Sequence, residues 1–415
     1  MTSGNHHKLP LPLEGIRVLD ATHIVAGPFC SQILADMGAE VIKIERPGSG
    51  DNARERGPFI EYPGGQRISS RYLGINRNKK SVTVDLRDPR CKRAFENMVK
   101  VSHVLLDNWG PGAFNRLGLG YDHLRAINPG LVYATITGYG DSNAAGRGPY
   151  SNWPANNLSI QGMSGWMELT GDPDGAPQSV GDNVGDSVPG LWTALGIVLA
   201  LETRRRTGQG QHVDMSMYEC MVSHMISNMN AYQAKGENPG RSWDRLATAG
   251  LAFKAKDGYV LMAGVRAAAA AARWKTLWIM MGRQDLSEDK RYLGGASGEF
   301  FRDNIIPAIE AWSRDLSKWD VAAKFTEIGF SMGVAQTIAD LAQCPHLEAR
   351  QMFVETGDTL GGRFKSVKTP IRLTGCLESR ADTPPTLGEN TRELLISLGG
   401  LTGEEVDRME EEKVV

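Results

Sequence analysis

The chain has 415 residues, of which 41% are hydrophobic and 23% charged, and its formal net charge at pH 7 is −2. This composition is that of a folded globular protein and excludes disordered, collagen-like and coiled-coil classes. The near-neutral charge argues against a protein dedicated to nucleic acid or to an anionic membrane surface. At roughly 150 residues per domain, the length predicts two or three domains.

The five cysteines are spread over the whole chain and show no C-x-x-C spacing. They predict reduced thiols and neither disulfides nor a zinc site, and the eight histidines show no metal-ligand spacing. Residues 1–10 lack the apolar core of a secretory signal. The longest apolar stretch, 190–201, is about eight residues too short to span a bilayer. We therefore expect a soluble, cytoplasmic protein without a metal site.

Strand-like and helix-like segments alternate through the first third of the chain. Apolar runs rich in β-branched residues predict strands at 15–22, 39–46, 81–86, 103–109 and 131–137. Helical spacing predicts helices at 27–38, at 89–102 and in a short segment ending near 128. This alternation predicts an α/β fold with a mostly parallel sheet covered on both faces. The Arg-rich and Gly-rich segment 48–78 is too long for an idle connection and predicts a functional or mobile loop.

The chain is then loop-like at 141–185, apart from an apolar insert at 158–169. A long apolar helix is expected at 187–206, because a proline in its first turn and three arginines at its end both suit a helix. A strand at 211–215 and a Met-rich helix to 234 follow. We expect the methionines at i+4 spacing to pack in the core. They are Met217, Met221, Met225 and Met229.

Residues 235–250 are polar and rich in Gly and Pro, so we expect a linker there. Beyond it, a smaller α+β domain is expected, with a hairpin at 252–263 and helices at 266–282, 299–314 and 317–327. The last section is expected to contain a helix at 336–342, β-like runs within 363–373 and a closing helix at 391–398.

The first βα turn, 23–28, carries no G-x-G-x-x-G pattern, so it is not the dinucleotide-binding fingerprint. Its Gly-Pro pair still allows the helix N-terminus to face a ligand, and a tight structural turn is the alternative. A basic cluster follows, which is either a solvated surface or a site for a phosphate-bearing molecule, with Arg46 best placed at a strand end. The cluster consists of Arg46, Arg54, Arg56, Arg67, Arg71, Arg77, Lys79 and Lys80.

Asp186 stands between a glycine-rich stretch and the apolar helix at 187–206. Either Asp186 or Ser187 is expected to cap that helix. A second role is open, because the helix dipole favours an ionised carboxylate that could act as a nucleophile. Neighbouring glycines would let a substrate carbonyl approach and would offer N–H donors to it. These glycines are Gly171, Gly175, Gly181 and Gly185.

Several stretches, specific in combination, carry a family resemblance over nearly the whole chain. They are LEGIRVLDATHIVAGPFCSQILADMGAEVIKIERPGSGD at 13–51, NKKSVTVDL at 78–86, DNWGPGAFNRLGLGYDHLRAINPGLVYATITGYG at 107–140, GMSGWMELTGDPDGAP at 162–177 and GDSVPGLWTALGIVLALETRRRTGQGQHVDMSM at 185–217. The C-terminal LGENTRELLISLG also fits. With these stretches the chain resembles the class III CoA-transferases of the formyl-CoA transferase and carnitine CoA-transferase type.

The resemblance implies a Rossmann-like large domain made from both ends of the chain, 1–234 and 331–415. A smaller α+β domain at 251–330 would be joined to it through the linker 235–250. Two such chains interlock in the family, so a homodimer is expected, with a paralogous partner chain as the alternative. The resemblance also implies that acyl-CoA and a carboxylic acid are the substrates and that no cofactor is tightly bound.

Asp186, within GDSVPG, aligns with the catalytic aspartate of the family. The implied mechanism passes through a mixed anhydride and then a CoA thioester on this carboxylate. Backbone N–H groups near Gly181 and Gly185 are the expected oxyanion donors. The positions implied to contact CoA are Val25, Ala26, Arg46, Val84, Asp85, Leu86, Arg87, Asn108, Trp109, Gly110 and Arg116.

Some positions differ from the formyl-CoA branch of the family. Val25 stands where that branch has Gln, Asn157 stands where it has Glu, and its tetraglycine lid is missing before residue 265. Formyl-CoA and oxalate are therefore not expected as substrates, whereas succinyl-CoA, a frequent donor in the family, is. Four tryptophans near the expected site suggest a bulky or aromatic dicarboxylate as acceptor. They are Trp109, Trp153, Trp166 and Trp192.

Two alternative functions stay open. An acyl-CoA racemase or epimerase of the same fold would pair a His with the aspartate, but segment 153–157, where the family places it, contains no His. The other alternative is a non-catalytic subunit of a hetero-oligomeric CoA-transferase. The presence of Asp186 argues against it.

Overall fold

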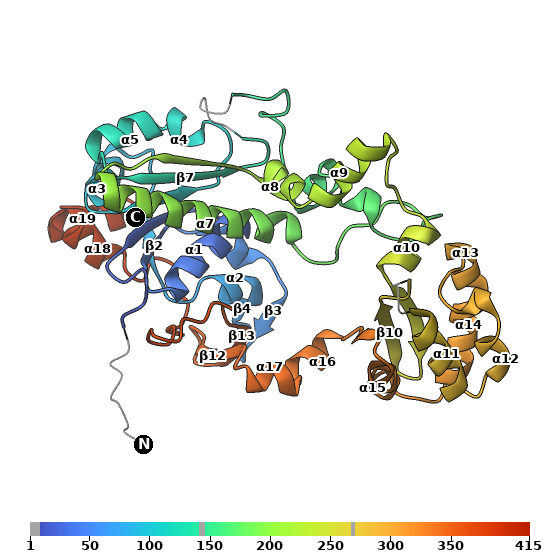
Figure 1. Ribbon diagram of the computed structural model, residues 1–415. Helices are drawn as coiled ribbons and strands as arrows, with labels where there is room; N and C mark the ends of the chain where they lie inside the picture. The colour runs from blue at the N-terminus through green and yellow to red at the C-terminus, as the bar shows by residue number, and fades with distance from the viewer. Residues whose placement is uncertain (1–8, 141–145, 267–269) are drawn as a thin grey trace, which may run out of the picture. The chain divides into compact units, whose positions relative to one another are not determined.

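The computed structural model describes residues 9–140, 146–266 and 270–415 (Figure 1). Its contacts divide the chain into two compact units. The first contains the chain up to Trp166, Ser179–Ser227 and Leu347–Val415, and the second contains Met167–Gln178 and Asn228–His346. Most of the N-terminal stretch 1–10, the start of the expected loop 141–185 and part of the expected helix 266–282 lie outside the described residues. The expected domain boundaries stay a prediction.

Six parallel strands form the sheet of the first unit, in the order β5-β2-β1-β6-β7-β8. Counted along the chain, this is the 3-2-1-4-5-6 order of a Rossmann sheet. The expected parallel α/β sheet is confirmed. The order reverses between β1 and β6, and such sheets bind their ligands at this point. The strands are β1 (Arg17–Ala21), β2 (Glu40–Glu45), β5 (Lys79–Thr83), β6 (Val104–Asp107), β7 (Val132–Thr137) and β8 (His212–Ser216).

Alternate residues of these strands face two separate cores, which is why the strands are apolar almost throughout. On one face lie α1 (Ala26–Asp36), α6 (Asn157–Met163), α7 (Val184–Thr207) and α8 (Met217–Ser223). On the other lie α3 (Pro89–Lys100), α4 (Ala113–Arg116), α5 (Tyr121–Ile127), α18 (Thr391–Ser397) and α19 (Gly403–Glu411). The C-terminal helices thus complete the core of the N-terminal sheet (Figure 1).

Helix α7 is the one helix in the described ranges that is long and apolar enough, by length and composition, to cross a membrane. It packs against α1, α8, β7 and β8. Buried residues at the contact include Gly190, Thr193, Ala194 and Ile197. One side of α7 therefore packs in the core of the first unit.

The second unit is built on an antiparallel sheet of β9 (Leu251–Ala255), β10 (Gly258–Ala263) and β11 (Ser331–Val334). Its core includes the fully buried Trp274 and Trp278. The expected hairpin is confirmed by the pairing of β9 with β10. The remaining elements here are η2 (Met167–Leu169), α10 (Trp243–Ala249), α11 (Ala270–Met280), α12 (Gln284–Ser287), η3 (Lys290–Tyr292), α13 (Gly298–Phe300), η4 (Phe301–Ile305), α14 (Ile306–Ser313), α15 (Lys318–Ile328) and α16 (Ile338–Ala342).

Three short helices form where the sequence predicted a loop, a linker or no element. Each of them begins with a side-chain hydrogen bond that caps its N-terminus. Segment 48–78 is structured, and Ser69 caps its helix by accepting the Tyr72 N–H. Helix α10 lies within the expected linker and is capped by Ser242. Helix α19 was not expected and has a capping box at Thr402. Elements not yet named are η1 (Asn52–Glu55), β3 (Phe59–Glu61), β4 (Arg67–Ser69), α2 (Ser70–Ile75), α9 (Ile226–Lys235), α17 (Pro345–Ala349), β12 (Phe353–Gly357) and β13 (Arg363–Val367).

The Met-rich helix is also interrupted. Helix α8 ends at Ser223 and α9 begins at Ile226. Met217 and Met221 are buried, whereas Met229 is half exposed. The break changes the face that the later methionines present, so the expectation of one continuous core stripe is wrong.

Candidate active site

The first βα turn lies where the strand order reverses. Asn108, just after β6, holds its backbone: Asn108 Oδ1 accepts the His23 N–H at 3.0 Å and Nδ2 donates to the His23 carbonyl at 2.9 Å. Both polar atoms of this amide are therefore engaged with the turn. Val25 and Ala26 follow at the start of α1, and no side chain caps this helix. The first N–H groups of α1 thus face a position where an anion binds favourably.

A cleft of about 580 Å³ opens at this edge of the sheet. Arg46 and Trp109 line it, and they also line a smaller hollow that reaches Thr22 and His23. The Arg46 guanidinium lies over the Trp109 ring, 5.7 Å from the centroid. Six of the eleven expected CoA contacts line this cleft together. Its lining consists of Arg46, Pro47, Ser49, Val84, Asp85, Leu86, Arg87, Trp109, Leu117 and Lys413.

The remaining expected contacts lie around the turn and on the loop after β6. Asn108 holds the turn, as described, and Gly110 adopts a φ of 91° that suits glycine. Arg116, exposed at the end of α4, donates to the Pro111 carbonyl at 3.0 Å. Lys413 was not expected. It reaches the cleft because the Asp85 N–H donates to the Val414 carbonyl, a pairing too distant in sequence to be seen there.

The eight cations of the basic cluster do not form one anion site. Four of them pair with carboxylates that the sheet and α1 bring between them, and Arg67 stacks on Phe59 at 4.2 Å. Mutual repulsion is thus relieved inside the protein, without a ligand. Arg46 is the member that lines the cleft. The pairs are Arg54–Glu45, Arg77–Asp36, Lys79–Asp20 and Lys80–Glu40.

Asp186 lies half-buried in the first turn of α7. The helix begins at Val184, so the expectation that Asp186 or Ser187 caps it is wrong. The cap comes instead from another element, because Asn157 Oδ1 on α6 accepts the Gly185 N–H at 2.9 Å. For the same reason the Gly185 N–H does not serve as the oxyanion donor that we expected.

Asn157 is fixed in turn by Gln161, a fully buried side chain of α6. Gln161 Nε2 donates to Asn157 Oδ1 at 2.9 Å, and Gln161 Oε1 accepts the Val180 N–H at 2.9 Å. The packing is close, since a Cβ at Gly185 would lie 2.7 Å from the Asn157 carbonyl oxygen. The sequence offers one sign of this pair, the polar Gln161 within the apolar insert 158–169. Together the two amides hold the first turn of α7.

Glycine also brings Asp186 near the first βα turn. A Cβ at Gly190 would lie 2.6 Å from the Ala26 carbonyl oxygen, so α7 and α1 touch through backbone here. Asp186 lies four residues before Gly190, on the same face of α7. It therefore lies close to the N-terminus of α1.

The ionisation of Asp186 is set by its surroundings. Burial raises the pKa of this carboxyl to about 6, and the positive charge of Arg71 opposes the shift. At pH 7 most of the carboxylate is still ionised, as a nucleophile requires. Arg71 was expected only as a member of the basic cluster, and its effect on Asp186 depends on the placement of α2.

The four tryptophans contact three different groups of aromatic neighbours. Trp109 lines the cleft. Trp192 lies six residues after Asp186, on another face of α7, and its Nε1 donates to His224 Nε2 at 3.1 Å. Trp166 packs on the same imidazole, and Trp153 is exposed beside Tyr150. The four rings therefore do not form one wall for an acceptor.

Other nucleophiles and metal ligands are less well placed in the described parts of the chain. No group of three or more His, Cys, Asp or Glu side chains there could hold a metal ion. All five cysteines are free thiols. Burial raises the pKa of Cys91 and of Cys220 to about 12, and a protonated thiol is a poor nucleophile.

Comparison with known proteins matches the chain to one family. The model of CoA-transferase family III matches residues 13–391. The chain is 34% identical to a succinyl-CoA:mesaconate CoA-transferase of Haloarcula hispanica, over 94% of this chain and 97% of that one. It is 32% identical to a succinyl-CoA–D-citramalate CoA-transferase of Chloroflexus aurantiacus, over 98% of each. A crystal structure of a CAIB/BAIF family protein from Brucella suis is similar, with TM-score 0.82, 31% identity and coverage of 94% and 100%. As its motifs indicated, the chain belongs to CoA-transferase family III and is a CoA-transferase.

Proposed function

We propose that this enzyme acts in the cytoplasm and transfers CoA from succinyl-CoA to a small dicarboxylic acid, with Asp186 as the carrier. Two similar relatives are named for succinyl-CoA together with mesaconate or D-citramalate, both dicarboxylates. One observation carries the proposal: Asp186 is a half-buried, ionised carboxylate near the N-terminus of α1. The aligned family position adds to it.

The proposed reaction exchanges acyl bonds on Asp186. Its carboxylate oxygen attacks the thioester carbonyl of succinyl-CoA, the C–S bond breaks, and a succinyl-aspartyl anhydride and CoA thiolate form. The thiolate attacks the aspartyl carbonyl, which releases succinate and leaves Asp186 as a CoA thioester. The acceptor carboxylate attacks this thioester, and the returning thiolate takes the acceptor acyl group and restores Asp186. Each step trades one activated acyl bond for another, so the energy of the thioester is retained.

The cleft is proposed to hold the nucleotide end of CoA. Arg46 brings a charged, planar donor group to the rim, which suits a phosphate. Arg87 and Lys413 add positive charge, although Arg87 also pairs with Asp85 at 2.8 Å. The start of α1 offers N–H groups to the diphosphate. These contacts would leave the thioester end for Asp186.

The test of the proposal is an acceptor screen with the purified enzyme. Succinyl-CoA is supplied with mesaconate, D-citramalate, aromatic dicarboxylates or monocarboxylates, and the new acyl-CoA is separated by chromatography. Transfer to dicarboxylates without accumulation of CoA is expected. Hydrolysis alone would contradict the proposal. Exchange of the α-hydrogen with deuterium, without transfer, would instead support the racemase alternative.

The rate is expected to follow the ionisation of Asp186. With a pKa of about 6, kcat/KM for succinyl-CoA should be about tenfold lower at pH 5 than at pH 7. Arg71→Met removes the charge that lowers this pKa, so the acid limb of the profile should move to higher pH. Arg71→Lys keeps the charge and serves as the matched control. A profile with the same midpoint in R71M and wild type would show that Arg71 does not act on Asp186.

We also propose that the enzyme is a homodimer, as the family resemblance implies. Helix α7 exposes an apolar stripe formed by Leu191, Leu195, Val198 and Leu199, each at least 42% exposed. The spacing of these residues places them on one face of the helix. A second copy of the chain would remove this surface from water.

Leu195→Glu is expected to shift the enzyme from dimer toward monomer, because a charge would then have to be buried in the apolar stripe. Light scattering after size-exclusion chromatography measures the mass. Val101→Glu changes a similarly exposed apolar residue after α3 and should leave the dimer intact. A dimeric L195E variant would exclude this stripe from the interface, and a monomeric wild type would favour the paralogous partner instead.

A further inference from the structure

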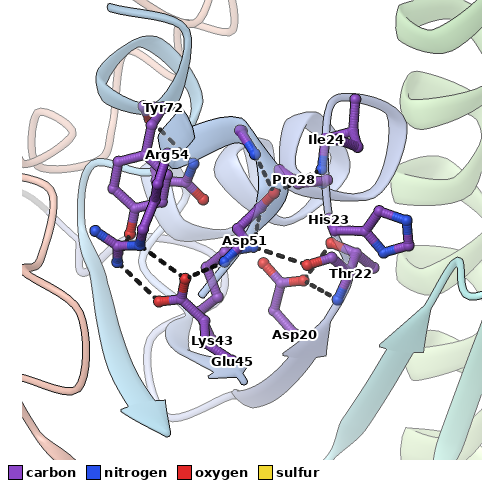
Figure 2. A network of polar contacts seen from close by, with 12 residues as sticks. Asp20, Thr22, His23, Ile24, Pro28, Lys43, Glu45, Asp51, Arg54 and Tyr72 are labelled. Carbon is purple, nitrogen blue, oxygen red and sulfur yellow. Dashed lines mark hydrogen bonds and ion pairs between the residues drawn. The ribbon is translucent and has the colours of Figure 1, made fainter. Parts of the chain in front are cut away.

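A network of buried charges lies directly beneath the first βα turn (Figure 2). The side chains of Lys43 and Lys79 are fully buried. Lys43 Nζ lies 2.8 Å from Asp51 Oδ2, and Lys79 Nζ lies 3.1 Å from Asp20 Oδ2. Because pairing hardly recovers the cost of removing such charges from water, buried ion pairs are weak evidence for a role in stability. The contacts of these charges therefore need another explanation.

The network ends on the backbone of the turn. Lys43 Nζ donates to the Thr22 carbonyl at 2.8 Å, and Asp51 Oδ1 accepts the Ile24 N–H at 2.9 Å. Figure 2 shows these side chains converging on the turn from β2 and from the segment after it, while the His23 imidazole points away. Two of the four residues before α1, Thr22 and Ile24, are thus held by buried, charged groups.

Ile24 has a backbone conformation that its side chain disfavours. Its φ is 71°, in the left-handed region where glycine is the usual residue and a β-branched residue is an outlier. Such a conformation persists only when surrounding contacts impose it. The charge-assisted bond from Ile24 to Asp51 is one such contact.

The turn leads directly into the proposed CoA site. Val25 and Ala26 follow Ile24, and the direction of the first N–H groups of α1 depends on the path through Ile24. We infer that Asp51 and Lys43 are positioning residues: they hold Ile24 in its left-handed conformation and so preform the start of α1 for CoA. The inference rests on the proposed function, and both residues act through the backbone of the turn.

The test compares CoA binding with turnover. In Asp51→Ala, the Kd of CoA by calorimetry and the KM for succinyl-CoA should both rise at least about tenfold, with kcat within about threefold of wild type. The split is expected because Asp186 lies on α7, outside the network. Lys43→Met keeps the aliphatic stem but removes the bond to the Thr22 carbonyl, and the same selective rise in KM is expected.

A second substitution separates positioning from general damage. Ile24→Gly in the Asp51→Ala background should restore most of the CoA affinity, because glycine adopts a positive φ without the steric cost. Ile24→Gly alone should change the Kd little. Asp36→Ala is the matched control, since it breaks the equally buried pair with Arg77, which does not touch the turn. It should lower the melting temperature and leave CoA affinity unchanged.

The outcomes are distinct. Wild-type CoA affinity in Asp51→Ala, a loss that Ile24→Gly does not restore, or an equal loss in Asp36→Ala would overturn the inference. If both Asp51→Ala and Lys43→Met fold and bind CoA normally, the network has no positioning role. If the wild-type enzyme itself neither binds CoA nor transfers it, the proposed function fails instead.

Discussion

Asp186→Ala is expected to lower kcat for CoA transfer by at least about 10⁴-fold, because no other group then accepts the acyl chain and the CoA in turn. The Kd of CoA should stay within about threefold of wild type, since the cleft lies on other elements. Steady-state kinetics and calorimetry measure the two quantities. A variant that retains substantial transfer would refute the proposed mechanism.

The control for this loss is Asp182→Ala, which removes an exposed carboxylate four residues earlier in the chain. It should keep the wild-type rate. A chemical test is independent of both variants: hydroxylamine added during turnover should convert the activated carboxyl to a hydroxamate, which peptide mass spectrometry locates. Modification at Asp186 is expected, and modification at a different residue would transfer the nucleophilic role to it.

Asp20→Ala is expected to destabilise the first unit by about 3–5 kcal/mol, because it leaves the buried Lys79 without its counter-charge. Asp20 is fully buried, contacts Lys79, and accepts bonds from Thr22 and Ser31. Burial already lowers the pKa of Lys79 to about 8 against the opposing effect of Asp20, so the pKa should fall further in the variant. Thermal unfolding followed by circular dichroism measures the change.

The pH dependence of this effect has a defined sign. Burial alone would raise the pKa of Asp20, but Lys79 and Lys43 hold it well below its ordinary value. The stability that this shift contributes is present above about pH 4 and is lost as the pH falls further. Asp20→Ala should therefore be less sensitive to acid than the wild type. Asp285→Ala removes an exposed partner of Arg283 and should change stability by less than about 0.5 kcal/mol.

The strands and helices that were predicted correctly from the sequence are those whose structure depends on residues nearby in the chain. The apolar runs at 39–46 and 131–137 form β2 and β7. A strand that is buried on both faces is a short run of apolar, often β-branched residues, so a few consecutive residues suffice to predict it. The same holds for α1 and α3, whose boundaries were expected to within two residues. The helix within segment 48–78 was not expected from the sequence. This helix, α2, is short and depends on a cap from Ser69.

The sequence by itself determined the parallel α/β sheet, the family and the candidacy of Asp186, since periodicity and motifs are local properties of the chain. Tertiary structure alone decided how the site is assembled. Asn157 caps α7 from another helix, Gly190 lets α7 touch α1, and Lys413 joins the cleft from the far end of the chain. It also decided that half of the basic cluster pairs with carboxylates of the same chain. Hydrogen bonds and ion pairs between distant segments depend on three-dimensional distance, which the spacing of residues along the chain does not specify.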